Sequence, residues 1–232
     1  MGSDGAVPLL QAIDLSRHYG SGPILNRVSI GLRSGTVTLL TGRNGSGKTT
    51  LVNCLAGFDR SYSGEVFLGE RRVDPVGPSE RARLGIVRTF QYPHLFDDFS
   101  VRDHLTLSLL ASSPAFRSYF RQRWRSAQAE RRTTVAGVAD LYTKRGAELS
   151  FGEMKLVNTA RAIATGARIL LLDEPLASLH GEKRVAMVDT IRSLRDAGCA
   201  MLVIEHVWSD LLPMADAAYE LENGNLQELP CE

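Results

Sequence analysis

A glycine-rich stretch near residue 45 has the residue types and spacing that bind phosphate. Residues 42–49 read Gly-Arg-Asn-Gly-Ser-Gly-Lys-Thr and fit the pattern G-x-x-x-x-G-K-[ST]. In such a loop the glycines let backbone N–H groups close around phosphate oxygens, and the lysine offsets the phosphate charge. Gly45 and Gly47 taken alone could also serve an ordinary turn. The candidate contacts to a nucleotide are Gly42, Asn44, Gly45, Ser46, Gly47, Lys48, Thr49 and Thr50.

The segments on either side of this loop fit the same chemistry. Residues 37–40 form an apolar run typical of a buried strand, and residues 50–56 are compatible with a helix. A helix that begins directly after the loop would point the positive end of its dipole at the phosphates. The sequence therefore predicts a strand, a phosphate loop and a helix that together bind a nucleotide.

Two carboxylates follow a second apolar run. Residues 168–172 read Arg-Ile-Leu-Leu-Leu, and Asp173, Glu174 and Pro175 come directly after them. Ligand sites of open α/β sheets form at the carboxyl ends of buried parallel strands. Asp173 and the Thr49 hydroxyl are candidate ligands of Mg²⁺, which takes oxygen ligands and keeps several waters. Glu174 is the candidate that polarises an attacking water. In isolation the triplet could also be a strand cap followed by a proline turn.

A third motif lies between these two, at residues 149–153, which read Leu-Ser-Phe-Gly-Glu. Ser150 and Glu153 have the spacing of a capping box, and the helix after them would carry Met154, Val157, Ala160, Ile163 and Ala164 on its apolar side. With this motif the sequence resembles the ATP-binding cassette (ABC) ATPase family, whose signature is usually written LSGGQ. Leu149, Ser150 and Gly152 keep that spelling, and Phe151 and Glu153 depart from it. A capped helix N-terminus would present Ser150, near Gly152, to the γ-phosphate of a nucleotide that another subunit holds.

The resemblance implies roles for three more residues. Tyr19 matches an aromatic residue that stacks on adenine, although it could instead be an exposed strand residue. Gln91 matches a glutamine that contacts Mg²⁺ and the attacking water and senses a membrane partner. His206 matches a histidine that reaches the γ-phosphate, although most histidines at strand ends are structural. The catalytic candidates are Lys48, Gln91, Glu174 and His206, and the candidate metal ligands are Thr49, Gln91 and Asp173.

Short features narrow the resemblance to one branch of the family. Residues 88–91 read Arg-Thr-Phe-Gln, and Leu95 and Phe96 follow, as in branched-chain amino acid transport ATPases. His180 stands where the family commonly has an aspartate that couples two sites across a dimer. The resemblance implies an ATPase that powers an importer of branched-chain amino acids or a related small polar solute. Its implied partners are transmembrane permease subunits and a second cassette, identical or paralogous.

The resemblance also implies a fold and a location. We expect an α/β P-loop NTPase fold with a mostly parallel core sheet, an antiparallel β layer and a helical subdomain. The 232 residues would form one domain, with residues 1–92 and 166–232 as core and β layer and about 93–165 as the helical subdomain. A net charge of +1 gives no general attraction to nucleic acid. We expect a cytoplasmic protein that reaches the membrane face through its partners, because no apolar run is long enough to span a bilayer.

Two other functions compete with transport. A soluble ABC ATPase of DNA repair or translation would usually carry long coiled-coil inserts or two cassettes on one chain, and neither is present. A regulatory binder without hydrolysis is disfavoured because Lys48, Asp173, Glu174 and His206 are all in place. The basic residues within 117–132 fit a solvated helix face best; acidic lipid, a partner loop and nucleic acid are the alternatives.

Overall fold

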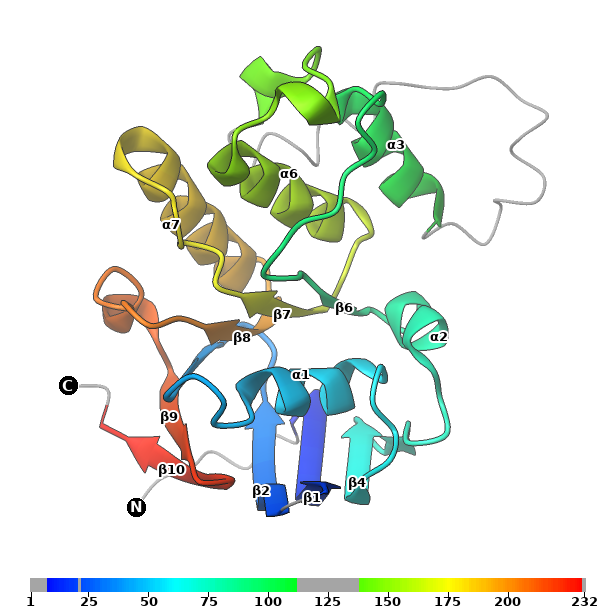
Figure 1. Cartoon of the computed structure of the whole chain (residues 1–232), viewed down its shortest axis with the longest axis vertical. Helices are drawn as coiled ribbons and strands as arrows, with labels where there is room; N and C mark the ends of the chain where they lie inside the picture. Colours follow the sequence, from blue (N-terminus) through cyan, green and yellow to red (C-terminus); the bar gives the residue numbers. More distant parts are fainter. Residues whose placement is uncertain (1–7, 21, 112–137, 231–232) are drawn as a thin grey trace.

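Two β-sheets with a helix between them organise the chain in the computed structural model, which describes residues 8–20, 22–111 and 138–230 (Figure 1). The larger sheet has the strand order β10-β9-β3-β8-β7-β6 and is parallel except for β10. Its strands are β3 (Val37–Thr41), β6 (Ile86–Arg88), β7 (Ile169–Asp173), β8 (Ala200–Ile204), β9 (Ala217–Glu222) and β10 (Asn225–Leu229). The smaller, antiparallel sheet has the order β2-β1-β4-β5, with β1 (Leu10–Tyr19), β2 (Gly22–Leu32), β4 (Ser63–Leu68) and β5 (Arg71–Arg72).

Helices lie on both sides of the larger sheet. Helix α1 (Lys48–Ala56) lies between the two sheets, whereas α6 (Phe151–Ala164) and α7 (Gly181–Asp196) lie on the opposite side of the core strands, with α3 (Val101–Ala111) next to α6 (Figure 1). The shorter helices are α2 (Pro78–Arg83), η2 (Ala139–Leu141), η3 (Gly146–Glu148) and η4 (Leu212–Met214). The predicted fold class is confirmed. The division at about residues 93–165 stays a prediction, and the basic residues 117–132 lie outside the described part.

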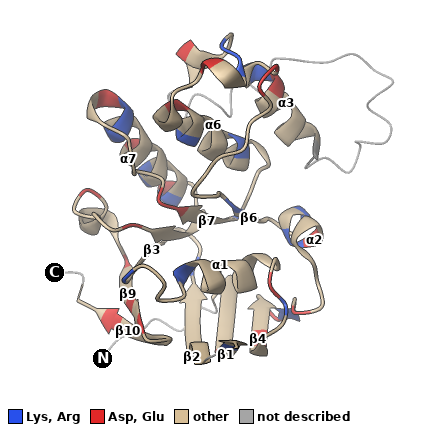
Figure 2. Cartoon of the chain, viewed as in Figure 1, with Lys and Arg blue, Asp and Glu red and all other residues tan. Residues whose placement is uncertain are grey.

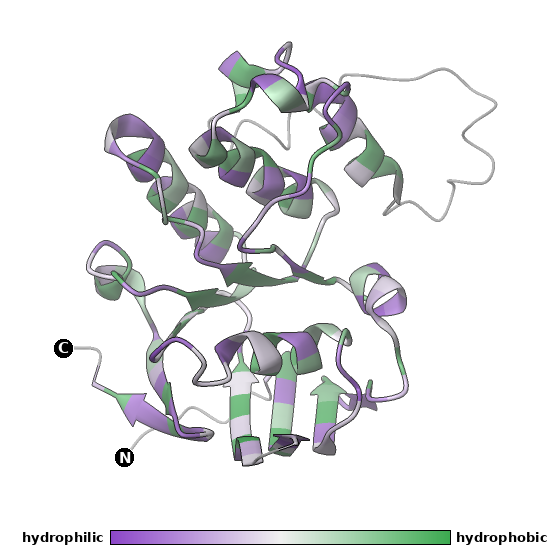
Figure 3. Cartoon of the chain, viewed as in Figure 1, coloured by the Kyte–Doolittle hydropathy of each residue, from purple (hydrophilic) through white to green (hydrophobic). Residues whose placement is uncertain are grey.

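The core strands are buried on both faces, which explains their uninterrupted apolar runs. On one face Leu170 and Leu172 of β7 pack into the core beneath α6 and α7. On the other face Ile169 and Leu171 pack into the core shared by α1 and the antiparallel sheet. Figure 3 shows β7 and β8 as hydrophobic strands at the centre of the molecule. Burying each such side chain contributes about 1.5–3 kcal/mol to the free energy of folding relative to leaving it exposed. The sheet therefore holds the residues at its strand ends in fixed positions.

The outer helix surfaces carry mixed charge. Helix α7 buries Met187, Thr190 and Ile191, whereas charged residues of both signs on the same helix are exposed. Figure 2 shows acidic and basic residues along α7. Within the described residues, none of the helices has the length and apolar character of a bilayer-spanning segment.

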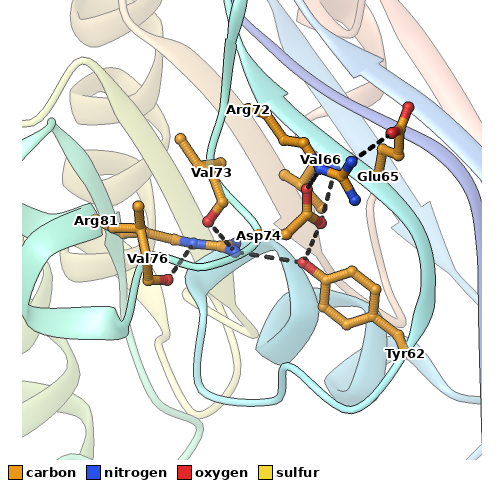
Figure 4. A network of polar contacts seen from close by, with 8 residues as sticks. All are labelled: Tyr62, Glu65, Val66, Arg72, Val73, Asp74, Val76 and Arg81. Atoms are coloured by element: carbon orange, nitrogen blue, oxygen red, sulfur yellow. Dashed lines mark hydrogen bonds and ion pairs between the residues drawn. The ribbon is translucent and has the colours of Figure 1, made fainter.

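A fully buried arginine joins α2 to the end of α1. Arg81 lies on α2, and its side chain is 0% exposed. The guanidinium donates hydrogen bonds of 2.6–3.0 Å to the carbonyls of Cys54, Leu55, Val73 and Val76. It also contacts the Tyr62 hydroxyl, which donates to Asp74 (Figure 4). Because the carbonyls at a helix C-terminus lack intrahelical donors, Arg81 serves as a cap for the helix that follows the phosphate loop.

We expect Arg81→Met to destabilise the fold, because it leaves several buried carbonyls without their donor. Each unsatisfied buried group costs about 1–3 kcal/mol, so the loss should reach about 3 kcal/mol or more and lower Tm by roughly 2–4 °C per kcal/mol. Differential scanning calorimetry would measure the change. Arg83→Met, at an exposed position of the same helix, is the control and should shift stability by less than about 0.5 kcal/mol. Equal shifts for the two variants would contradict this role of Arg81.

Candidate ATP-binding and hydrolysis site

The predicted phosphate loop connects β3 to α1. Two of its glycines are required by close backbone contacts. A Cβ atom at Gly42 would lie 2.3 Å from the Leu221 carbonyl oxygen, and one at Gly47 would lie 2.7 Å from the Ile24 carbonyl oxygen. Both residues also have positive φ, 144° and 107°. The loop therefore packs against β2 and β9 as only glycine allows, and its free side faces solvent.

Lys48 and Ser46 supply polar groups inside the loop. Lys48 Nζ donates to the carbonyls of Gly42 and Arg43 at 2.6 and 3.1 Å, so its ammonium lies within the loop. Burial lowers the pKa of Lys48, and Glu174 and Asp173 act in the opposite direction. Ser46 Oγ is buried and has no hydrogen-bond partner among the described residues. The loop thus offers a cation, a free hydroxyl and a helix N-terminus to an anion.

A cleft of about 430 Å³ opens beside this loop. It brings together the predicted residues from the ends of five separate segments of the chain. Its lining consists of Tyr19, Ile24, Asn44, Gly45, Ser46, Gly47, Lys48, Thr49, Thr50, Gln91, Asp173, Glu174 and His206. Ile24 was not predicted, because an apolar residue on a strand carries no local signal of ligand contact. Gly42, Ser150 and Gly152, which were also predicted to contact the nucleotide, do not line this cleft.

Glu174 is held in an unusual backbone conformation at the end of β7. Its φ is 49°, a left-handed value that costs about 1–3 kcal/mol for a residue with a side chain. The Glu174 N–H donates to the Ile204 carbonyl at 2.9 Å, and Lys155 Nζ donates to the Glu174 carbonyl at 2.7 Å. The carboxylate accepts from Gln91 Nε2 at 3.0 Å and lies 3.4 Å from His206 Nε2. The backbone contacts offset the strain and aim the carboxylate at two other predicted catalytic residues.

Asp173 is the buried neighbour of this carboxylate. Burial raises the pKa of Asp173, and the positive charge of Arg88 acts against this rise. Arg88 Nη2 lies 3.2 Å from Asp173 Oδ2, and Thr89 Oγ1 accepts from the Asp173 N–H at 3.1 Å. Prediction from sequence assigned no role to Arg88 or Thr89 by themselves, because each is separated from Asp173 by more than 80 residues.

The donor set in the cleft fits a magnesium ion. Thr49, Gln91 and Asp173 offer a hydroxyl, an amide oxygen and one carboxylate, and the phosphates of ATP would complete the oxygen ligands. The described residues hold no cluster of three or more His, Cys, Asp and Glu that would suit a metal without such phosphates. One or two carboxylates together with substrate phosphates are the usual way in which Mg²⁺ is bound.

Tyr19 stands at the rim of the cleft on a fixed support. It ends β1, and its hydroxyl donates to Asp59 Oδ2 at 2.6 Å. The Arg17 guanidinium lies 4.2 Å from the ring centroid and also binds Asp59, at 2.7 Å. Arg17 and Asp59 do not line the cleft. They hold the Tyr19 ring from outside, and the ring faces the cleft.

Ser150 begins α6 as a helix cap. Its hydroxyl accepts from the Glu153 N–H, and Glu153 Oε2 accepts from the Ser150 N–H at 2.9 Å, which completes the predicted capping box. Ser150 itself is exposed. Gly152 faces the segment before α7, because a Cβ atom there would lie 3.0 Å from the Ser178 carbonyl oxygen.

Comparison with known proteins identifies the family. The protein family described as ABC transporter matches this chain over residues 25–177, which is more than half of its length. The chain belongs to the ABC transporter family. It is one of the ATP-binding and ATP-hydrolysing cassettes of that family.

Relatives and solved structures agree with this assignment. The chain is 32% identical to a probable branched-chain amino acid transport ATP-binding protein LivG of Archaeoglobus fulgidus, covering 94% of this chain and 87% of that protein. It is 31% identical to a ribose import ATP-binding protein RbsA 2 of Streptomyces avermitilis, covering 96% of this chain and 44% of that protein. A solved nucleotide-free ATP-binding cassette from an ABC transporter superposes with a TM-score of 0.80 at 29% identity, covering 95% of this chain and 90% of that one.

The cassette departs from the usual family signature at Glu153, and the structure shows how that charge is accommodated. Besides the Ser150 contacts, Glu153 Oε1 accepts from Lys144 Nζ at 3.0 Å and from Lys183 Nζ at 3.1 Å. Burial alone would raise the pKa of Glu153, but the hydrogen bonds from Ser150, Lys144 and Lys183 outweigh it and lower the pKa to about 2. The carboxylate therefore stays charged and joins the start of α6 to α7. A departure outside the signature, His180, is exposed at the N-terminus of α7 and makes no side-chain capping bond.

We expect Glu153→Gln to lower the Tm of the cassette at pH 7 by several degrees, because Lys144 and Lys183 lose their carboxylate. The folded pKa is depressed, so the stabilisation by Glu153 is present above about pH 4.5 and is lost as pH falls toward 2. The difference between variant and wild type should therefore shrink over that window in thermal melts. Glu70→Gln, at an exposed turn residue, is the control and should change Tm little. A difference that is constant with pH would contradict the assignment.

Proposed function

We propose that this cassette binds MgATP in the cleft and powers a membrane importer, with two cassettes sharing each nucleotide. One observation carries the proposal. The cleft gathers Lys48, Gln91, Glu174 and His206, while the exposed, capped start of α6 at Ser150 lies outside it. An exposed helix N-terminus is an anion site, and a second cassette can bring its own Ser150 to the γ-phosphate.

Hydrolysis follows from the groups that line the cleft. Lys48, Ser46 and the start of α1 bind the β- and γ-phosphates and offset their charge. Glu174 accepts the proton of an attacking water and orients it for in-line displacement, and Gln91 and His206 fix the carboxylate. Thr49, Gln91 and Asp173 would hold Mg²⁺, which supplies charge stabilisation on the transferred phosphoryl group. Tyr19 offers its ring to the adenine.

The γ-phosphate determines whether two cassettes stay together. It can contact Ser150 of a second cassette only when the pair is closed, so ATP binds the closed pair more tightly than the open one. Hydrolysis removes these contacts, and the pair opens. A ligand shifts an equilibrium only through such differential affinity.

A second depression on the surface suits a permease subunit. This aromatic groove has a volume of about 250 Å³ and is lined by Ala56, Phe58, Pro78, Ser79, Ala82, Ile86, Val87, Arg88 and Phe90. Phe58 and Phe90 are 52% and 44% exposed, and exposed aromatic side chains are enriched at protein interfaces. The groove ends one residue before Gln91, which holds Glu174. A cytoplasmic segment of the permease in this groove would place the cassette on the inner face of the membrane.

The proposed cargo is a branched-chain amino acid. Support comes from relatives named for branched-chain amino acid transport in Archaeoglobus fulgidus and Salmonella typhimurium. The ribose importer among the relatives makes another small polar solute the competing cargo.

We expect Glu174→Gln to bind ATP normally, to slow phosphate release by roughly 10²–10⁴-fold and to accumulate as an ATP-bound dimer, because the general base is lost. Phosphate release and light scattering with and without ATP measure the two effects. Lys48→Ala is the control and should fail both to bind ATP and to dimerise. A Glu174→Gln cassette that turns over at the wild-type rate, or stays monomeric with ATP, would refute the mechanism.

Cells that lack this cassette should lose most uptake of radiolabelled leucine, isoleucine and valine and should retain ribose uptake. The wild-type chain should restore uptake, and the Glu174→Gln chain should not, because import needs hydrolysis. Loss of ribose uptake with intact leucine uptake would replace the proposed cargo and leave the ATPase assignment in place.

A further inference from the structure

Arg88 connects three elements around the candidate metal site. It ends β6, and its side chain is 4% exposed. Its Nη2 binds the Asp173 carboxylate at the end of β7, and its Nη1 donates to Asn53 Oδ1 on α1. Its Nε donates to the Thr89 carbonyl at 3.2 Å. The edge of one planar cation thus binds the predicted metal ligand and the helix that follows the phosphate loop.

The flat face of the same guanidinium packs against the aromatic groove. Its central carbon lies 4.5 Å from the Phe90 ring centroid and 5.7 Å from that of Phe58. The two rings pack edge to face, with centroids 5.5 Å apart, and both line the groove. Among the described residues, Arg88 alone combines an ion pair to Asp173 with a ring contact in this groove.

We propose that Arg88 is a positioning residue that links the occupancy of the aromatic groove to the position of Asp173. The inference rests on the proposed function, which assigns the groove to a permease segment and Asp173 to Mg²⁺. A guanidinium is planar, permanently charged and held by several hydrogen bonds at once. Because the group is rigid, a displacement on the side of Phe90 also moves the nitrogens that bind Asp173. A permease segment that displaces Phe90 therefore moves the guanidinium and, through it, the carboxylate that binds the metal.

The groups around Arg88 explain why a lysine could not replace it. A lysine ammonium is a point charge without the flat face that stacks on Phe90 or the fork that reaches Asp173 and Asn53 together. The link requires the geometry of arginine and not only its charge.

Metal affinity tests the link without a permease. Mn²⁺ binding to the cassette with a non-hydrolysable ATP analogue is measured by electron paramagnetic resonance for wild type, Phe90→Ala, Arg88→Lys and the double variant. Phe90→Ala should weaken Mn²⁺ binding by about 2- to 5-fold, as expected for loss of a cation–π contact. In the Arg88→Lys background the same change should have no effect, because the connecting side chain is already lost.

Four further variants keep the test decisive if Arg88→Lys folds poorly. Phe90→Leu keeps an apolar side chain without a π face and should behave like Phe90→Ala, whereas Phe90→Trp should retain wild-type affinity. Phe58→Ala, at the more distant ring, should have a smaller effect. Phe99→Ala changes a ring of similar exposure that packs on Phe96 and His104, and it should leave Mn²⁺ affinity unchanged.

Three results would overturn the inference, and they can be told apart. If wild type binds Mn²⁺ but the Phe90 variants bind it equally well, Arg88 does not link groove and metal site, and the proposed function stands. If wild type with the ATP analogue binds no Mn²⁺, the assignment of Asp173 as a metal ligand fails as well. Equal effects of Phe90→Ala in both backgrounds would likewise show that Arg88 does not carry the effect.

Discussion

The register of the parallel core strands is the constraint on which the site depends. Leu40 of β3 pairs with Ile204 of β8, and Ile204 pairs with Asp173 of β7, so these strands end at the same level. The phosphate loop, the two carboxylates and His206 each follow one of those ends. A slip of one residue in any strand would exchange the side chains that pack into the two cores, and the close packing of both cores opposes such a slip. The chemistry at the edge is therefore positioned by the apolar strands beneath it.

Charges of opposite sign offset one another at this edge of the sheet. Burial lowers the pKa of Lys48 and raises that of Asp173, which in each case favours the neutral form. The charges of Glu174 and Asp173 act against the shift of Lys48, and those of Arg88 and Lys48 act against the shift of Asp173. Glu174 reaches its position only through a strained backbone that Lys155 and Ile204 hold. In the proposed mechanism, a triphosphate with Mg²⁺ would replace part of this internal pairing, and Ser150 of a second cassette would enclose the γ-phosphate.

Local motifs made much of this site predictable from sequence. The phosphate loop, the carboxylates after β7 and the capping box at Ser150 each depend on residues within a few positions of one another. The contacts that could not be predicted join distant segments. Arg81 caps α1 from 26 to 27 residues away, Lys183 reaches Glu153 across 30 residues, and Asp59 holds Tyr19 across 40. No local pattern marks such pairs, because each depends on how the sheets and helices pack. The fold class followed from the family resemblance, whereas these long-range contacts required the structure.

Hydrogen exchange measured by mass spectrometry tests most directly whether the nucleotide site is divided between two cassettes. The backbone of residues 42–52 and of residues 150–154 would be compared with and without a slowly hydrolysed ATP analogue over a range of cassette concentrations. We expect the ATP analogue to protect residues 42–52 at every concentration and to protect residues 150–154 only where dimers form. Protection of residues 150–154 in dilute monomer, or no protection at residues 42–52, would contradict a nucleotide site divided between two cassettes.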